Sequence, residues 1–358
     1  MSTKDLYEIF LRSSGIVTDS RKITNNCIFF SLKGAFFNGN EFAKSAIDKG
    51  ALVAVVDEEI YYHEKGSFIF VENSLVTLQK LANYHRKKLN TKIIGITGSN
   101  GKTTTKELIN SVLKTKFKTY CTKGNLNNHI GVPISLLEIS NETEFAIIEM
   151  GANHLGEIKL LSNIAEPNYG YITNFGNAHL DGFGSKEGVI KGKSELYDFL
   201  RKNSGFIFYN SDDEKQNIML SDYPDKYGFG LEKGDLNYSV KSINPKIILN
   251  VNNTTIESSL FGIFNVQNII SAISIGCYFG VSMQNVREGV SSYISSNNRS
   301  QIIIKNKNTI VLDAYNANPT SMLLAIKSFE KSYNKNKILI LGDMHELGKE
   351  ENKFHQEI

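Results

Sequence analysis

Residues 97–105 read TGSNGKTTT and directly follow the apolar run KIIGI at residues 92–96. The β-branched residues of that run favour a central β-strand. The segment 103–117 then repeats apolar residues at helical spacing. One helical face would carry Leu108, Ile109, Val112, Leu113 and Phe117. The glycines therefore lie between the end of a buried strand and the N-terminus of a helix.

This junction has the features of a phosphate-binding loop. Gly98 and Gly101 permit tight turns and a close approach of a ligand to the backbone. The first N–H groups of a helix have no intrahelical acceptor and attract anions. Lys102 can reach phosphate oxygens, and the hydroxyl of Thr103 can ligate Mg²⁺. The pattern is GxxGKT, because Ile96 stands where the longer GxxxxGK[ST] motif has its first glycine.

An ordinary glycine-rich turn is the alternative. The strand, lysine, threonine and helix stand in register, which favours nucleotide phosphate binding. The predicted phosphate site comprises Gly98, Ser99, Asn100, Gly101, Lys102, Thr103 and Thr104.

Composition limits the class of protein. The 358 residues are 41% hydrophobic and 22% charged, which is typical of a soluble globular protein of two or three domains. The net charge of +3 argues against a nucleic-acid-binding protein. Cys27, Cys121 and Cys277 match no zinc or CxxC pattern, so we expect free thiols in a reducing cytoplasm. We find neither a signal peptide nor a membrane span, and we expect a cytoplasmic protein.

The chain is predicted to form three α/β parts, at residues 1–90, 91–313 and 314–358. The first alternates short strands with helices, and its strands include CIFFSL, ALVAVV and SFIFV. The second carries the buried-strand patterns KIIGIT, FAIIEM, YGYITN and GFIFYN between helical segments, which predicts a mostly parallel sheet. Within it, residues 226–260 indicate antiparallel strands.

The third part predicts one helix, a strand KILILG at residues 337–342 and the start of another helix. About 45 residues are too few for an independent core, so we expect an incomplete domain there.

Polar side chains follow two further predicted strands. Glu149 ends FAIIEM, and Asn174, His179 and Asp181 follow YGYI. In an open α/β sheet, the carboxyl ends of the strands form the edge where ligands bind. Together with Thr103, this carboxylate and imidazole predict a Mg²⁺ site. For His179 alone, a loop histidine bonded to backbone is the alternative.

Five motifs in this order resemble the Mur ligase family. They are TGSNGKTTT, EMGANHLGEI, TNFGNAHLDGFGS, GKSELY and DAYNANPTSM. The resemblance extends from TDSR at residue 18 to LGDMHELG near residue 348. It implies a UDP-binding first domain, a central P-loop-type ATPase domain and a Rossmann-like third domain. EMGANHLGEI and YNANPTSM most resemble the members that add D-alanyl-D-alanine.

The resemblance implies an ATP-dependent ligase of peptidoglycan precursor synthesis. It would join D-Ala-D-Ala to UDP-MurNAc-tripeptide through an acyl phosphate. Lys102 would cradle the β- and γ-phosphates, Thr103 and Glu149 would hold one Mg²⁺, and His179 a second. Lys193 of GKSELY matches a lysine that is carbamylated in several members, and a carbamate there would bind the second Mg²⁺. Lys186 and Lys191 lie nearby, and only the family register selects Lys193.

Further residues are implied for the nucleotide. Asn265 and Asn268 would share one helical face and present amides to adenine, although Asn265 would equally serve as a helix cap. Arg299 resembles the family arginine that reaches the phosphates. The ribose and base would meet Asp313, Tyr315 and Asn316.

The UDP-substrate contacts rest on the resemblance alone, since surface serine, arginine and lysine are common. The diphosphate would meet Ser20, Arg21 and Lys33. The UDP-sugar would meet Asn125, Asn127 and Asn128. We expect a monomer that neither binds nucleic acid nor inserts into a membrane.

Three other readings stay open. A sister ligase would add another amino acid to a UDP-MurNAc substrate, and the glycine and asparagine motifs count against it. A ligase like folylpolyglutamate synthase shares the phosphate loop but lacks a UDP-type first part. A GTPase or ATPase switch would hydrolyse nucleotide without an acceptor, and it leaves EMGANHLGEI unexplained.

Overall fold

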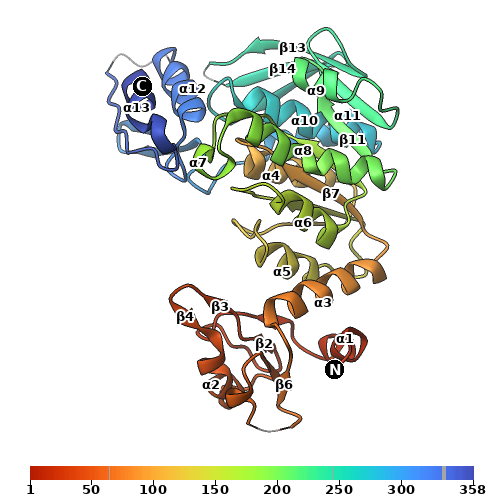
Figure 1. Ribbon diagram of the computed structural model, residues 1–358. Helices are drawn as coiled ribbons and strands as arrows, with labels where there is room; N and C mark the ends of the chain where they lie inside the picture. Colours follow the sequence, from red (N-terminus) through yellow and green to blue (C-terminus); the bar gives the residue numbers. More distant parts are fainter. Residues whose placement is uncertain (64, 245, 333–335) are drawn as a thin grey trace. The chain divides into compact units, whose positions relative to one another are not determined.

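A computed structural model describes residues 1–63, 65–244, 246–332 and 336–358 (Figure 1). The chain forms two compact units. The first comprises Met1–Asn90, Leu126–Asn141 and Ile164–Glu166, and the second comprises Thr91–Asn125, Glu142–Asn163 and Pro167–Ile358. Within the described ranges, no helix has both the length and the apolar character that crossing a bilayer requires.

The first unit contains a parallel sheet with the strand order β1-β2-β5-β6. The predicted strands CIFFSL, ALVAVV and SFIFV are confirmed as β2, β5 and β6. The sheet consists of β1 (Ile16–Val17), β2 (Ile28–Phe30), β5 (Val53–Val56) and β6 (Phe68–Phe70). Every residue of β2 and β5 is buried, as expected for parallel strands that are covered on both faces.

Helices and a short hairpin complete this unit. Helix α3 (Ser74–Lys88) follows β6. It begins after Asn73, whose side chain accepts a hydrogen bond from the N–H of Val76 at 2.9 Å. The remaining elements are α1 (Thr3–Leu11), β3 (Lys33–Gly34), β4 (Phe37–Asn38), η1 (Gly39–Phe42), α2 (Ala43–Asp48), η2 (Glu59–Tyr61) and α5 (Gly131–Leu137).

The second unit contains a sheet of the order β15-β14-β13-β12-β11-β10-β7-β9-β8 among the described residues. Neighbours from β8 to β13 pair in parallel, and β13, β14 and β15 pair antiparallel. The prediction of antiparallel strands at residues 226–260 is therefore confirmed for β13 to β15 and wrong for β12, which pairs in parallel with both β11 and β13. The strands are β7 (Lys92–Thr97), β8 (Thr119–Cys121), β9 (Phe145–Glu149), β10 (Tyr169–Ile172), β11 (Phe206–Asn210), β12 (Lys226–Gly230), β13 (Leu236–Ser242), β14 (Ile247–Val251) and β15 (Thr254–Ser258).

Helices cover both faces of this sheet. On one face, α4 (Lys102–Leu113) packs against α10 (Asn265–Tyr278) and α11 (Met283–Ser291), and the predicted apolar face of α4 enters this core (Figure 1). On the other face, α8 (Lys186–Lys202) lies so close to β10 that a Cβ at Gly170 would meet Leu196 and Leu200. The other helices around the sheet are α6 (Glu157–Ala165), α7 (Leu180–Phe183) and α9 (Glu214–Met219).

The strand order places the predicted site at a topological switch. From β7 the chain passes to β8 and β9 on one side, and it then returns to β10 on the other side. Ligands of open α/β sheets bind at the carboxyl ends of the strands beside such a switch. The glycine loop follows β7, Glu149 ends β9, and residues 173–179 follow β10. All three segments therefore open onto one edge.

The last part of the chain departs from the prediction in one element. KILILG forms no strand, and residues 336–347 contain neither helix nor strand. A strand requires a neighbour for its N–H and C=O groups, and no described strand pairs with this segment. The side chains of Ile338 and Ile340 are 82% and 92% exposed. The prediction of a strand here was wrong for the described chain.

Two helices of this part are confirmed. The elements after α11 are β16 (Gln301–Lys305), β17 (Asn308–Leu312), α12 (Pro319–Glu330), η3 (Gly348–Glu350) and α13 (Glu351–Glu357). Met344, Leu347 and Phe354 form a small buried cluster, and Leu180 packs against it. Residues 336–358 are therefore attached to α7, which follows β10.

Candidate active site

The glycine loop has the backbone geometry of a close turn. Gly98 has φ of 137° and Gly101 has φ of 79°, values that residues with a Cβ rarely adopt. A Cβ at Gly98 would collide with the Thr173 hydroxyl, and one at Gly101 would collide with the Asn268 amide. Both positions therefore favour glycine for two reasons: the backbone has a positive φ, and a neighbouring side chain leaves no room for a Cβ.

The loop is anchored to the segment after β10. The N–H groups of Ser99 and Asn100 donate to the backbone and side-chain oxygens of Asn174, at 3.0 and 3.1 Å. The Thr173 hydroxyl donates to the carbonyl of Asn100 at 2.6 Å. Among the described residues, Nδ2 of Asn100 is buried without a hydrogen-bond acceptor. An acceptor on a bound ligand would satisfy it.

Lys102 is folded back onto this loop. Its Nζ donates to the carbonyls of Gly98 at 2.8 Å and Ser99 at 3.0 Å. Burial lowers its pKa to about 8, with a smaller lowering by the charge of Arg299 and an opposing effect of Glu149. A cation that has lost its water in this way is stabilised by an incoming anion.

Thr103 and Glu149 meet directly beneath the loop. The Thr103 hydroxyl donates to Oε1 of Glu149 at 3.2 Å, and both side chains are buried. Lys106, one helical turn after Lys102, places Nζ 3.6 Å from Oε2 of the same carboxylate. Our reading of the sequence missed Lys106. Its position at i+4 from Lys102 was the available signal, because such residues share a helix face.

His179 lies at the same edge but contacts the last part of the chain. It has a positive φ of 54° and begins α7. Its Nδ1 forms a hydrogen bond with the carboxylate of Glu346, a residue that the sequence did not single out. Burial lowers the pKa of His179, Glu346 raises it, and the charges of Lys102 and Lys193 lower it. The two lysines thus act electrostatically on one imidazole.

The structure distinguishes Lys193 from its neighbours. Lys186 and Lys191 are exposed, whereas Lys193 has no accessible surface. Its Nζ donates to the carbonyl of Ala152 at 2.8 Å, in the loop after β9, and lies 5.0 Å from the centre of the Phe183 ring. Burial, and then the charge of Lys102, lower its pKa well below the usual range.

The predicted adenine residues form a buried chain of hydrogen bonds. Nδ2 of Asn265 donates to the carbonyl of Phe261 at 2.7 Å, and Nδ2 of Asn268 donates to Oδ1 of Asn265 at 2.8 Å. Oδ1 of Asn268 accepts from the Thr105 hydroxyl at 3.0 Å. Asn268 therefore connects α10 with the helix of the glycine loop. Its contact with adenine stays a prediction.

Arg299 and Tyr315 lie together. The guanidinium stands 3.9 Å from the centre of the tyrosine ring, within the range of a cation–π contact. The carboxylate of Asp313 accepts from the N–H of Ser300 at 3.2 Å. Asn316 is exposed and accepts from the N–H of Ala317 at 2.9 Å.

The last part of the chain also reaches the glycine loop. Asn318 caps α12 and donates from Nδ2 to Oδ1 of Asn100 at 2.6 Å. The hydroxyl of Thr320 accepts from the N–H of Asn177 at 3.3 Å. Asn318 belongs to the motif DAYNANPTSM, yet its pairing with the loop was not predicted.

In the first unit, the predicted diphosphate residues already have partners. Arg21 pairs with Asp19 at 2.8 Å and is 86% exposed, and the carbonyl of Ser20 accepts from Lys49 at 3.2 Å. Lys33 pairs with Asp57 at 3.2 Å. Their contact with a diphosphate stays a prediction.

The asparagine motif is divided between the units. Asn125 belongs to the second unit, in the turn after β8, whereas Asn127 and Asn128 belong to the first. Oδ1 of Asn128 accepts from the N–H groups of Ile130 and Gly131, at 3.1 and 2.8 Å, and so orders the start of α5.

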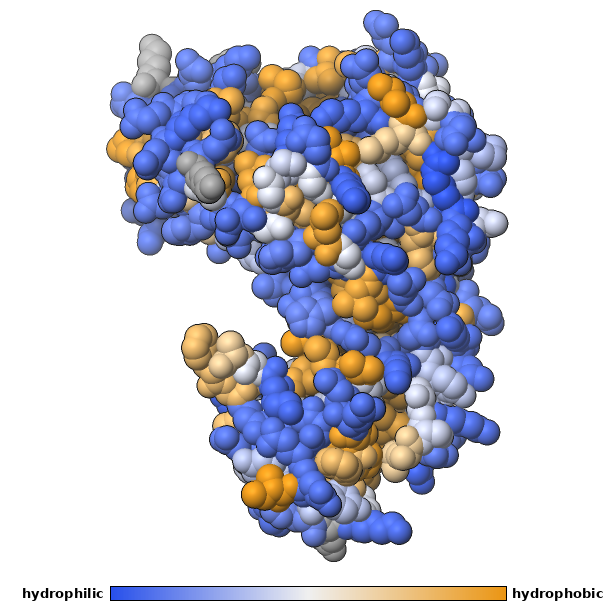
Figure 2. All heavy atoms as spheres, viewed as in Figure 1, coloured by the Kyte–Doolittle hydropathy of each residue, from blue (hydrophilic) through white to orange (hydrophobic). Residues whose placement is uncertain are grey.

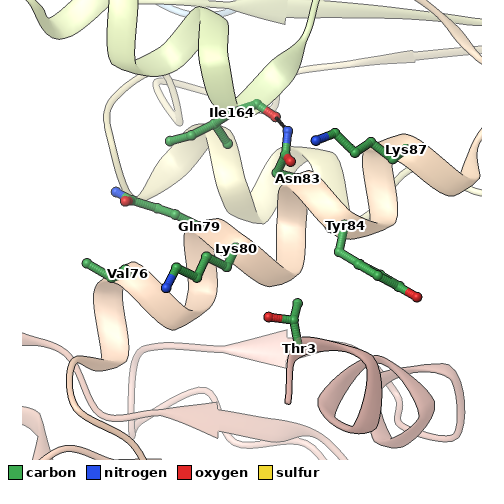
Figure 3. A pocket seen from close by; sticks show the side chains of 8 residues that line it. All are labelled: Thr3, Val76, Gln79, Lys80, Asn83, Tyr84, Lys87 and Ile164. Carbon is green, nitrogen blue, oxygen red and sulfur yellow. Dashed lines mark hydrogen bonds between the residues drawn. The ribbon is translucent and has the colours of Figure 1, made fainter.

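Two surface features of the first unit contain none of the predicted site residues. Apolar side chains gather over the β3–β4 hairpin, where Phe36 and Phe37 are 100% and 60% exposed (Figure 2). A shallow pocket of about 370 Å³ lies along α3, and Gln79, Lys80 and Asn83 are among the residues that line it (Figure 3).

Three segments of the chain match models of known protein families. Residues 12–88 match the Mur ligase family, catalytic domain, and residues 96–276 match the Mur ligase middle domain. Residues 298–358 match the Mur ligase, glutamate ligase domain.

The curated relatives and the solved structures that resemble this chain include Mur ligases as well. The UDP-N-acetylmuramoyl-tripeptide–D-alanyl-D-alanine ligase of Bacillus subtilis is 37% identical over 353 residues, which cover 96% of this chain and 76% of that protein. MurF from Acinetobacter baumannii has a TM-score of 0.90 at 30% identity, over 99% of this chain and 82% of that one.

MurF from Thermotoga maritima, solved in complex with ADP, has a TM-score of 0.86 at 28% identity, over 97% of this chain and 81% of that one. These family models, relatives and solved structures all name one family. A member of that family binds ADP, which is consistent with a glycine loop suited to phosphate and with Glu149 beside it. The chain belongs to the Mur ligase family.

Proposed function

We propose that the chain is an ATP-dependent ligase that joins D-alanyl-D-alanine to UDP-N-acetylmuramoyl-tripeptide in peptidoglycan precursor synthesis. The observation that carries the proposal is its 37% identity, over 96% of its length, to a curated ligase of this specificity. The glycine loop, Glu149 and Lys193 supply the groups that such a reaction requires.

The reaction proceeds through two group transfers. An oxygen of the tripeptide carboxylate attacks the γ-phosphorus of ATP. The bond between the γ-phosphorus and the oxygen that bridges the β- and γ-phosphates breaks, and ADP is released. The amine of D-Ala-D-Ala then attacks the acyl phosphate carbon. Phosphate leaves as the amide forms, and the amine loses a proton. Catalysis of such transfers is mostly positioning and neutralisation of charge.

The loop binds the phosphates of ATP. Lys102 exchanges its two carbonyl acceptors for β- and γ-phosphate oxygens, and the first N–H groups of α4 point at the same anion. Nδ2 of Asn100 gains the acceptor that it lacks. Asn265, Asn268, Arg299, Asp313, Tyr315 and Asn316 are proposed to contact the rest of the nucleotide.

Thr103 and Glu149 are suited to hold Mg²⁺. Two neighbouring ligands of an octahedral Mg²⁺ stand about 2.9 Å apart, and the two side-chain oxygens are already 3.2 Å apart. A buried carboxylate at a ligand-binding edge also fits a cation site. When bound, Mg²⁺ would neutralise charge on the transferred phosphoryl group.

A second cation site is proposed at His179 and Lys193. Only a neutral amine reacts with CO₂, and burial favours the neutral form of Lys193. Its nitrogen attacks the carbon of CO₂, a proton leaves, and a carbamate anion results. If this anion is required, Lys193→Ala loses activity and short-chain carboxylates partly restore it. Lack of rescue in a folded variant would count against carbamylation.

Each part of the chain has a proposed role. Residues 1–90 would bind the UDP portion of the substrate, with Ser20, Arg21 and Lys33 at the diphosphate. Residues 91–313 would bind ATP, and their Asn125, Asn127 and Asn128 would meet the UDP-sugar. Residues 314–358 would contribute to the binding of D-Ala-D-Ala.

The function is tested by substrate-dependent release of phosphate. ATP hydrolysis should require both UDP-MurNAc-tripeptide and D-Ala-D-Ala, and mass spectrometry should find the pentapeptide product. Equal release without either substrate would indicate an NTPase. Product formation with a single amino acid, on a UDP-MurNAc acceptor of another length, would indicate a sister ligase.

A further inference from the structure

Lys106 is a charged side chain that the proposed mechanism does not use. It lies in the glycine-loop helix α4 and has no accessible surface. A buried lysine is costly unless partners replace its hydration. Its partners should therefore indicate what it does.

Within α4, Oε1 of the neighbouring Glu107 lies 4.0 Å from Nζ of Lys106. Its partners outside this helix belong to two different segments. Nζ donates to the carbonyls of Thr122 at 2.6 Å and Gly124 at 3.4 Å, in the turn after β8. It also stands 3.6 Å from Oε2 of Glu149, at the end of β9. The same ammonium thus contacts a turn and the proposed metal carboxylate.

A further hydrogen bond closes this arrangement. The backbone N–H of Glu149 donates to the Thr122 hydroxyl at 3.0 Å. Both the backbone and the side chain of Glu149 are therefore held by Lys106 and its partner. With Oε2 facing Lys106, the other oxygen, Oε1, faces the Thr103 hydroxyl.

We propose that Lys106 is a positioning residue, which orients the Glu149 carboxylate toward Thr103 and fixes the Thr122–Gly124 turn that leads to Asn125. This inference rests on the proposed function, because it assigns Glu149 to the metal. Lys106 itself would touch neither the metal nor the nucleotide. Its loss should act only through Glu149.

The test measures metal binding directly. Mn²⁺ is titrated into the full chain with ADP at a concentration equal to that of the protein, and electron paramagnetic resonance reports the free Mn²⁺ after subtraction of a titration of ADP alone. Removal of an outer partner of a metal ligand typically weakens binding by about 10- to 100-fold. We expect Lys106→Met to weaken Mn²⁺ binding at least about tenfold, and Lys106→Arg to weaken it less, because it keeps the charge.

A matched control removes a different buried contact of the same helix. The Ser111 hydroxyl of α4 donates to the carbonyl of Gly289 at 2.7 Å, on the side that packs against α11. Ser111→Ala should lower the stability and leave Mn²⁺ binding unchanged. Lys106→Met with the same Mn²⁺ affinity as the parent chain would overturn the proposal.

A double variant keeps the test decisive even if Lys106→Met does not fold. Residues that act through one group have non-additive effects. In a Glu149→Gln background, Lys106→Met should cause no further loss of Mn²⁺ affinity. A further loss of tenfold would mean that Lys106 acts independently, and the inference would fail. Unchanged Mn²⁺ binding in Glu149→Gln alone would instead refute the metal assignment of the proposed function.

Discussion

At the scale of single residues, Lys102 shows how one side chain serves the ligand more than the fold. Its two acceptors are carbonyls of its own loop, and burial lowers its pKa to about 8. The desolvation that destabilises the free ammonium would be offset by phosphate oxygens. Its contribution should therefore appear on nucleotide binding.

Lys102→Met should reduce ligase turnover by at least about 100-fold, since it removes the cation that faces the phosphates. The melting temperature should change little, because removal of the desolvated ammonium offsets the loss of its two loop hydrogen bonds. Lys114→Met, at the exposed end of the same helix, is the control and should keep full turnover. Near-parental activity of a folded Lys102→Met chain would refute the assignment.

His85 predicts a dependence of stability on pH. Its Nε2 donates to the carbonyl of Ile139 at 2.9 Å, and its Nδ1 accepts from the Tyr7 hydroxyl at 3.2 Å. Burial lowers the pKa of His85 below the usual value of about 6.5. Between the two pKa values the unfolded chain binds more protons, so the free energy of unfolding falls as pH drops below about 6.5.

Urea denaturation at pH 7.5 and pH 5.5 measures this effect. The parent chain should be less stable at pH 5.5, and His85→Asn should show a smaller difference between the two conditions. His129→Asn replaces an exposed histidine of the same unit and should keep the parental difference. The same pH dependence in all three chains would show that His85 is not responsible.

At the scale of elements, the two ends of α4 have different functions: the first turn faces the proposed ligand site, and the later turns pack in the core. Its first turn carries Lys102 and Thr103, and its later turns pack against α10 and α11. Gly289 of α11 permits this approach, since a Cβ there would stand 2.7 Å from the Ser111 carbonyl oxygen and 2.7 Å from the Cα of Val112.

Gly289→Ala should destabilise the second unit by about 1–3 kcal/mol, the usual cost of overpacking a core. The shift of the urea midpoint measures it. Glu288→Ala, at the exposed neighbouring position of α11, should change the midpoint little. A Gly289→Ala chain as stable as the parent would mean that the two helices can separate without cost.

At the scale of the whole molecule, the last part of the chain is held by the rest of the second unit. Its buried cluster contains few side chains, and Leu180 of α7 packs against it. The hydrogen bonds between His179 and Glu346 and from Asn318 to Asn100 add to this attachment. Opening of such a segment should require less free energy than unfolding of the sheet.

Met344→Ala should release this segment without unfolding the sheet. Met344 is 1% exposed, and truncation of a buried methionine costs about 2–5 kcal/mol. Hydrogen exchange of residues 336–358 should accelerate, while β7 and β9 keep their protection. Ile340→Ala, at a side chain 92% exposed, should leave both rates unchanged. Faster exchange throughout the sheet would contradict separate attachment.

Much of this architecture followed from the sequence. The strands β7, β9, β10 and β11, the helix α4 and its apolar face were predicted, because each rests on a local pattern of side chains. The glycine loop was predicted for the same reason. The nine residues 97–105 contain the glycines that allow a positive φ, the lysine, and the first residues of the helix. The order of motifs then identified the family.

Only the tertiary structure decided contacts between distant segments. It buried Lys193 and left Lys186 and Lys191 exposed. The spacing of these lysines along the helix did not show which of them would be buried. It joined Lys106 to Glu149. It also left KILILG without a strand partner, although its composition favours a strand. Propensity acts between neighbours in sequence, whereas burial, ion pairs and strand pairing depend on which segments meet in space.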